Sequence, residues 1–165
     1  MVDERWSPQE EQHEVQNAML AATRQCFIEI DKEEWKFETL CDLYEAVTIT
    51  KGVVYCNTRE RVEWVSEHMR AKGQTVSTVH GEMEEAERAM SFAVALQIAR
   101  VLINYDMPTQ VESYIDRFAP YYRFGRRDIM VNFVLPSEMS MLRQIEQFYH
   151  TEIPELPMNV DEFFW

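Results

Sequence analysis

Hydrophobic residues recur with two different periods along this 165-residue chain. Short apolar runs rich in β-branched residues predict strands, and apolar residues spaced by three and four predict helices. The predicted strands cover 25–30, 52–56, 75–79, 100–105 and 129–135. The predicted helices cover 33–47, 59–72, 80–97, 108–118 and 137–149.

The alternation of strands with helices indicates an α/β domain with a parallel sheet that is covered on both faces. Ligands of such sheets bind at the carboxyl ends of the strands. In this sequence those ends are Asn57-Thr58, His80-Gly81 and Asp106-Met107-Pro108.

Several residues mark where helices begin and end. Asn57 or Thr58 is the expected N-cap of the helix that ends at Gly73, and Thr109 with Glu112 matches a capping box. Residues 1–22 are polar and only weakly periodic, so they predict an N-terminal arm or frayed helix before a domain over 23–165. The proline-interrupted tail 151–165 predicts extended chain.

Composition narrows the classes of function. Hydrophobic residues make up 46% of the chain, which is globular composition, and the formal net charge is −13. Free-standing nucleic-acid binders usually carry a basic face, so this charge argues against strong unaided binding of RNA or DNA. Cys26, Cys41 and Cys56 lie far apart and predict reduced thiols. Without a signal peptide or an apolar run long enough for a membrane span, an intracellular protein without membrane contact is expected.

The usual catalytic motifs are missing from the sequence. It contains no GxxxxGK[ST] loop, no GxGxxG after a strand, no HExxH and no GxSxG. The acidic run over 82–87 is typical of a solvated helix N-terminus. One feature stands out: the stretch 114–128, YIDRFAPYYRFGRRD, carries Arg117, Arg123, Arg126 and Arg127 in an acidic chain.

Six stretches in order carry a family resemblance that covers roughly residues 20–162. They are EEWKFETLCDLYEAVTIT (33–50), VVYCNTRERVEWVSEHM (53–69), TVSTVHGEMEEAER (75–88), INYDMPTQVESYIDR (103–117), RFGRRD (123–128) and IEQFYHTEIPELPMNV (145–160). Together they resemble the C-terminal RecA-like domain of DEAD-box RNA helicases of the eukaryotic initiation factor 4A type, including its 4A-III paralogue. The P-loop, DEAD box and Q motif of that family belong to its first domain and have no counterpart here.

The resemblance implies an RNA-binding set at the strand ends. Asn57, Thr58 and Arg59 match the family's RNA-backbone motif, where amides and hydroxyls hold phosphates without reading sequence. Gly81 matches the glycine at which RNA approaches a helix N-terminus. Arg88 matches the arginine of a Gln-x-x-Arg motif, but its glutamine is replaced by Glu85, which would repel a phosphate.

One family segment has no counterpart. The family has two strands joined by a TD-x-x-ARG-x-D segment before INYD, whereas only the fourteen residues Ala89–Leu102 separate Arg88 from Ile103 here. We therefore expect the sheet to lack one central strand, and its former neighbours must pair with each other or leave backbone groups unsatisfied.

The arginine-rich stretch matches the family's HRxGRxxR motif in part. Arg117 and Arg123 are kept, whereas Asp116, Ala119 and Pro120 replace the histidine, the glycine and the middle arginine. In the family the second and third arginines reach the γ-phosphate, and such fingers contribute about 10³–10⁵ in rate. Arg117 and Arg123 are thus the expected nucleotide-binding pair, with Arg123 the remnant of the finger.

The resemblance implies the C-terminal half of an ATP-dependent RNA helicase of mRNA metabolism, in translation initiation or mRNA processing. ATP and Mg²⁺ would bind only if a first RecA-like domain is supplied, so we expect no catalysis by the isolated chain. Expected partners are single-stranded RNA, held weakly, and a HEAT-repeat scaffold of the initiation-factor type; DNA is not expected. A location in the nucleus, the cytoplasm or both follows. The alternatives are a non-catalytic scaffold-docking module and a degenerate gene product.

Overall fold

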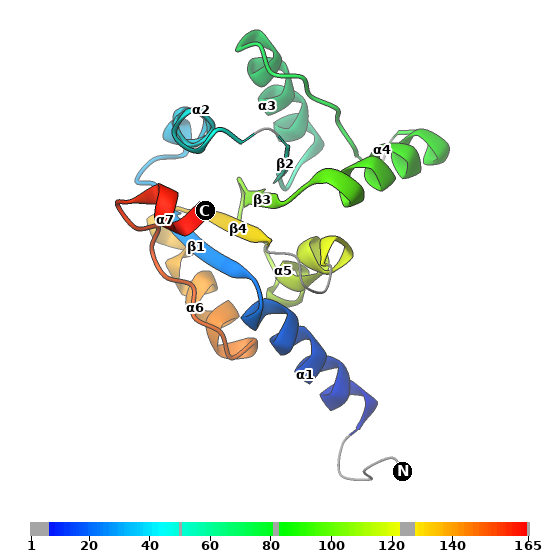
Figure 1. Ribbon diagram of the computed structural model, residues 1–165, viewed down its shortest axis with the longest axis vertical. Helices are drawn as coiled ribbons and strands as arrows, with labels where there is room; N and C mark the ends of the chain where they lie inside the picture. Colours follow the sequence, from blue (N-terminus) through cyan, green and yellow to red (C-terminus); the bar gives the residue numbers. More distant parts are fainter. Residues whose placement is uncertain (1–6, 50, 81–82, 123–127, 165) are drawn as a thin grey trace.

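Four parallel strands form the centre of the molecule, in the order β1-β4-β3-β2 (Figure 1). The computed structural model describes residues 7–49, 51–80, 83–122 and 128–164. The strands are β1 (Arg24–Glu29), β2 (Gly52–Tyr55), β3 (Val101–Asn104) and β4 (Ile129–Val134). The predicted α/β class with a parallel sheet is confirmed.

Helices cover both faces of this sheet (Figure 1). One face carries α1 (Pro8–Ala21), α5 (Val111–Phe118) and α6 (Met139–Phe148), and the other carries α2 (Lys36–Val47), α3 (Arg59–Ala71) and the short α7 (Val160–Phe164). Helix α4 (Glu85–Ile98) lies beyond the β2 side of the sheet. Short 3₁₀ turns occupy Glu33–Trp35, Ala119–Tyr121 and Pro136–Glu138.

Strand β4 shows how the sequence pattern builds two cores. Met130 and Val134 enter the cluster under α1, α5 and α6, whereas Val131 and Phe133 enter the cluster under α2 and α3. Alternate side chains of a strand point to opposite faces, so a continuous apolar run suits a strand buried on both sides. Each fully buried side chain of this size contributes about 1.5–3 kcal/mol.

Strand β2 pairs directly with β3, in a register from Gly52 opposite Val101 to Tyr55 opposite Asn104. Helix α4 ends at Ile98 and β3 begins at Val101, so no strand lies between them. Of the two expected outcomes, re-pairing across the gap is not what the described sheet shows, because β2 pairs only with β3 and its other edge has no strand partner among the described residues.

Three local predictions are wrong. Residues 74–80 form no strand, because β2 pairs with β3 on its other edge and the segment remains separated from β2 by a cavity. Gln110, without a side-chain cap, precedes α5, so Thr109 and Glu112 form no capping box there. The tail contains α7, because Phe164 is buried in the core.

Other local predictions are confirmed. Thr58 is the N-cap of α3, its hydroxyl accepting from the amide of Arg61 at 3.2 Å. After α3 the chain turns at Gly73, whose φ of +87° lies in the left-handed region that favours glycine.

The N-terminal region differs from a detached polar arm. Helix α1 starts with a capping box between Ser7 and Glu10, and its Leu20 is buried in the core. The ring of His13 stacks on Phe148 with centroids 4.7 Å apart and hydrogen-bonds the Phe148 carbonyl. Residues 8–21 are therefore attached to α6, and a boundary at residue 22 stays a prediction. None of the described helices has the length and apolar character needed to cross a membrane.

Candidate functional site

Arg117 of α5 joins the carboxyl ends of β2 and β3. Its Nη1 donates to Asn104 Oδ1 at 2.9 Å and to the carbonyl of Asp106 at 2.7 Å, and its Nη2 donates to Asn57 Oδ1 at 2.6 Å. The guanidinium also lies over the ring of Tyr55, 5.4 Å from its centroid. The arginine thus holds two strand ends together from the helix that packs beneath them.

The environment of Arg117 favours a structural use of its charge. Burial lowers the pKa of the guanidinium, but an arginine remains protonated at neutral pH. Hydrogen bonds from a charged donor are about twice as strong as neutral ones, and three oxygens receive them here. These contacts stabilise the strand ends, and a nucleotide phosphate would have to compete with them.

A second group of charges lies beside this arginine. The ammonium of Lys36, almost fully buried, contacts Asp106 Oδ1 at 3.0 Å and Glu33 Oε2 at 3.1 Å. Asp106 Oδ2 accepts from the amide of Asn57 at 2.9 Å, and Arg61 also contacts Glu33. Asp106 therefore ties the ends of β2 and β3 to α2. Glu33 is thus paired with both Lys36 and Arg61.

From Asn104 a chain of buried hydrogen bonds crosses the sheet. Asn104 Nδ2 donates to Asn132 Oδ1 at 2.7 Å, and Asn132 Nδ2 donates to the hydroxyl of Tyr114 at 3.2 Å. The Tyr114 hydroxyl donates to Gln25 Oε1 at 2.7 Å. Burial raises the pKa of Tyr114, so it stays a donor over the physiological range. An unmade bond here would cost about 1–3 kcal/mol.

The structure brings only some of the predicted site residues together. Asn57 and Arg117 are in contact, and Thr58 is adjacent but its hydroxyl caps α3. Arg59 points along α3 and pairs with Glu63 at 2.9 Å. Arg88 lies on α4, where it lines a small hollow of about 290 Å³ together with Glu85. Gly81 and Arg123 lie outside the described residues.

Sequence reasoning placed Asp106 at a strand end but missed the two cations of this cluster, Lys36 and Arg61. A signal for Lys36 exists, because it occupies the same helical face as Leu40, Leu43 and Val47, all of which are buried. A cation in that register predicts a buried acidic partner. Within the described parts of the chain, no group of His, Cys, Asp and Glu side chains could hold a metal ion.

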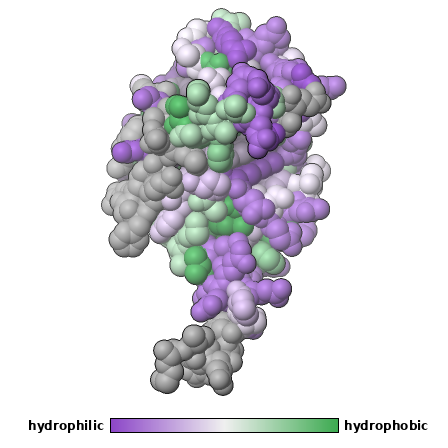
Figure 2. Space-filling model, turned by 90° about the vertical axis from the view of Figure 1, so that its right-hand side faces the viewer, coloured by the Kyte–Doolittle hydropathy of each residue, from purple (hydrophilic) through white to green (hydrophobic). Residues whose placement is uncertain are grey.

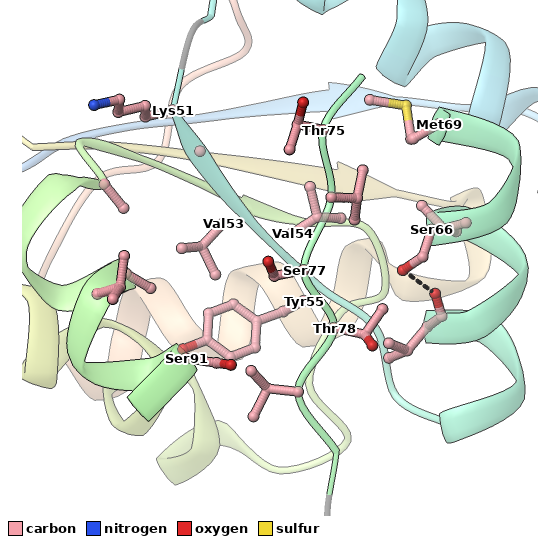
Figure 3. A pocket seen from close by; sticks show the side chains of 18 of the residues that line it. Lys51, Val53, Val54, Tyr55, Ser66, Met69, Thr75, Ser77, Thr78 and Ser91 are labelled. Atoms are coloured by element: carbon pink, nitrogen blue, oxygen red, sulfur yellow. Dashed lines mark hydrogen bonds between the residues drawn. The ribbon is translucent and has the colours of Figure 1, made fainter. Parts of the chain in front are cut away.

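A separate cavity of about 790 Å³ runs along the free edge of β2 (Figure 3). Its walls are β2, α3, the segment 74–79 and α4, and the labelled residues of the figure come from these elements and from the adjoining Lys51. It lies along the side of the sheet, whereas Arg117 and Asp106 lie at the strand ends.

A family model described as "Helicase conserved C-terminal domain" matches residues 35–95. The chain is 39% identical over 160 residues to the ATP-dependent RNA helicase eIF4A of Schizosaccharomyces pombe, covering 86% of this chain and 41% of that protein. It is 42% identical over 160 residues to the ATP-dependent RNA helicase fal1 of Aspergillus oryzae, covering 86% of this chain and 40% of that protein. The chain thus spans about two fifths of the length of these relatives.

Solved structures agree on the fold. The C-terminal domain of the DEAD-box protein Dbp5 superposes with a TM-score of 0.75 at 21% identity, over 87% of this chain and 95% of that one. A DEAD box protein of Methanococcus jannaschii superposes with a TM-score of 0.74 at 23% identity, over 84% of this chain and 43% of that one.

The match to eIF4A of Neosartorya fischeri also shows a difference in length. It extends over 164 residues at 41% identity, yet includes 88% of this chain, which is about 145 residues. About 19 residues of the matched region therefore have no counterpart here, which suits the loss of one strand with its loop. With the strand order and the partial motifs, these findings show that the chain is a C-terminal RecA-like domain of the DEAD-box type, homologous to that domain of the eIF4A proteins.

Proposed function

We propose that this chain is the C-terminal half of an eIF4A-like ATP-dependent RNA helicase and is inactive in ATP hydrolysis when isolated. The observation that carries the proposal is the identity of about 40% to eIF4A and fal1 over most of the chain. ATP and Mg²⁺ bind only when a first RecA-like domain is supplied, because the sequence holds no P-loop.

The contacts of Arg117 support the proposed lack of ATP hydrolysis by the isolated chain. Its guanidinium is engaged by Asn57, Asn104 and Asp106, so reaching a phosphate would break those bonds. Pro120 stands where the family has its middle arginine, which leaves Arg123 as the remaining finger. Losing one such finger alone would lower the rate by about 10³ or more.

Weak binding of single-stranded RNA is the activity that we assign to the isolated chain. Dbp5 of S. cerevisiae has been solved bound to RNA and ADP BeF3, which makes RNA a reasonable ligand of this domain type. We assign the contacts to Asn57, Thr58, Arg59, Gly81 and Arg88. With a net charge of −13, we expect a Kd of about 10⁻⁴ M and a shallow salt dependence, because few phosphates are contacted.

Two assays test these assignments. ATP turnover with added single-stranded RNA should stay at background, and turnover that disappears in Arg123→Ala would contradict the proposal. RNA binding, measured by fluorescence anisotropy across salt concentrations, should weaken about fivefold in Arg88→Ala. The matched control is Arg143→Ala on α6, where the arginine pairs with Glu146 and should not affect binding.

A second candidate, a scaffold-docking module without catalysis, is favoured by two exposed tryptophans. Trp35 and Trp64 are each 44% exposed, and Trp64 stacks on His68 with centroids 3.9 Å apart. Dbp5 has been solved bound to nup159 and gle1, and a HEAT-repeat scaffold is the partner that we propose here. A pulldown with such a scaffold that recovers the wild type but not Trp64→Ala would support docking.

Two further points belong to the proposal. We place the protein inside the cell, in the nucleus, the cytoplasm or both, as mRNA metabolism requires. The missing stretch of about 19 residues also fits a degenerate gene product. Sequencing of transcripts across the codons for 89–102 decides this, because a transcript that encodes the extra segment would make this chain a shortened form.

A further inference from the structure

The outer edge of β2 carries unpaired backbone groups. The amide of Tyr105 donates to the Tyr55 carbonyl at 3.0 Å, so the peptide groups of Tyr55 face β3. The backbone N–H and C=O groups of successive residues point to opposite edges of a strand, so those of Gly52 and Val54 face the edge away from β3. Among the residues that the structure describes, no strand pairs with that edge. An exposed edge of this kind is a template for another strand.

The cavity beside this edge has the lining that an extended apolar chain requires. Val53 and Val54 project from β2, Met69 from α3, and Val76 from the segment 74–79. Hydroxyl groups from Ser66, Thr75, Ser77, Thr78 and Ser91 are interspersed among them, and Lys51 is the single charged residue of the described lining (Figure 3). The lining therefore favours an occupant that is apolar and nearly uncharged.

The rim of the cavity leaves large apolar side chains exposed. Met90 and Val94 of α4 are 72% and 52% exposed, and Val79 is 37% exposed. Figure 2 shows hydrophobic patches on an otherwise largely polar surface, on the side of the molecule toward which α4 extends in Figure 1. Met90, Val94 and Val79 all line the same cavity, so its apolar wall continues to the surface.

We propose that this groove binds an extended peptide segment of another protein, which adds a strand to the free edge of β2. Main-chain hydrogen bonds would supply affinity, and the apolar lining would select alternate side chains. The four residues of β2 span about 13 Å, which suits a segment of four to six residues. Such a segment has apolar, β-branched residues at alternate positions and little charge.

A single strand fits this site better than a second copy of the chain. The segment 74–79 and α4 stand on either side of the groove, so the flat edge of a folded domain meets them before it reaches β2. The relatives have about 19 residues more than this chain within the matched region. A strand supplied by another protein would occupy space that a shortened sheet leaves unfilled.

The probe is a synthetic peptide, acetylated and amidated at its ends, with the sequence VLINY of residues 101–105. This sequence already pairs with β2 on the opposite edge, so its side chains suit the two faces of the sheet. When this peptide is added to the full chain, we expect the NMR amide signals of residues 52–56 of the chain to shift. The peptide is then N-methylated at alternate residues, in two versions. Methylation of the set that faces β2 should weaken binding at least tenfold, and methylation of the other set should not.

Protein variants provide the complementary test. Val54→Pro removes the outward amide and leaves the bonds of Tyr55 to β3, so it should weaken binding about tenfold without unfolding the chain. Should it unfold, the double change Met90→Glu and Val94→Glu on the exposed face of α4 gives an equivalent loss. Met158→Glu is the matched control, because Met158 is fully exposed and does not line the groove.

Three outcomes would overturn the proposal. Equal losses from both methylated peptides would mean apolar adsorption without strand pairing. Nuclear Overhauser contacts between the backbones of 75–79 and β2 in the free chain would mean that the chain completes its own edge. Unchanged amide signals at 1 mM peptide would mean that the groove binds no such segment.

Discussion

The two sides of the sheet differ sharply in how well they are packed. All six residues of β4 are buried, and its neighbours β1 and β3 supply Cys26, Leu102 and Ile103, which are at most 1% exposed. All four residues of β2 are only partly buried, and the cavity and the exposed apolar residues of α4 lie on that side. The missing segment is thus accommodated at one edge, while the β1–β4–β3 region keeps a complete core.

The polar contacts follow the same division. The buried chain from Asn104 through Asn132 to Gln25 crosses β3, β4 and β1, and it does not extend along β2. Besides its backbone pairing with β3, β2 is attached at its carboxyl end, where Asn57 contacts Arg117 and Asp106. We therefore expect substitutions in the β1–β4–β3 region to affect global stability more than equivalent substitutions in β2.

The largest effect should come from the centre of the packed region. Phe133→Ala removes a side chain that is 0% exposed and should lower the free energy of unfolding by about 3–5 kcal/mol. Val54→Ala on the half-buried β2 should cost about 1 kcal/mol or less. Urea unfolding followed by circular dichroism measures both. Equal losses of stability in the two variants would contradict the proposed difference in packing between the β1–β4–β3 region and β2.

A smaller effect is expected where β2 is attached. Lys36→Met leaves Asp106 without its buried cationic partner and should cost about 3 kcal/mol. The double change Lys36→Met and Asp106→Asn should recover part of that loss, because no uncompensated charge remains. Lys32→Met is the control, since Lys32 is exposed over the ring of Trp35, and it should change stability by less than about 0.5 kcal/mol. If Lys36→Met lowers the stability no more than Lys32→Met does, the ion pairs of Lys36 do not stabilise the attachment of β2.

The smallest effect should appear only at alkaline pH. Burial raises the pKa of the Cys56 thiol at the end of β2 from 9.0 to about 12, and that of Tyr105 from 10.0 to about 12. The folded chain then holds these protons more tightly than the unfolded chain, so stability is complete below pH 9 and declines between pH 9 and about 12. Thermal melts across this range, with Cys56→Ala as comparison, should show a shallower decline in the variant. If stability declines equally with pH in the wild type and in Cys56→Ala, other buried groups cause the decline.

The strands that could be predicted from the sequence are those with self-contained apolar runs, such as 129–135. The prediction failed at 75–79, whose TVSTV sequence suits a strand but finds no pairing edge, because β2 is separated from it by the cavity. Strand pairing depends on the position of a second strand, which the local β-propensity of a segment does not determine.

The candidate site was predictable in its location but only partly in its contacts. The strand ends at Asn57 and Asp106 follow from the parallel sheet, and Arg117 follows from a family motif. That Arg117 is engaged by three oxygens depends on how α5 packs under the sheet, which no spacing in the sequence specifies. The buried position of Lys36 could have been inferred from its helical face, whereas its partner Asp106, 70 residues away, could not.

The strand order also has a consequence for synthesis on the ribosome. β1 begins at Arg24, but its only strand partner in the described sheet is β4, which ends at Val134. The best-packed part of the domain therefore cannot form until β4 has emerged, and β2 and α3 leave the ribosome before β3 and β4. A nascent chain of this domain would expose the apolar surface of β1 until β4 has been synthesised, and chaperone dependence should follow from the order of its strands.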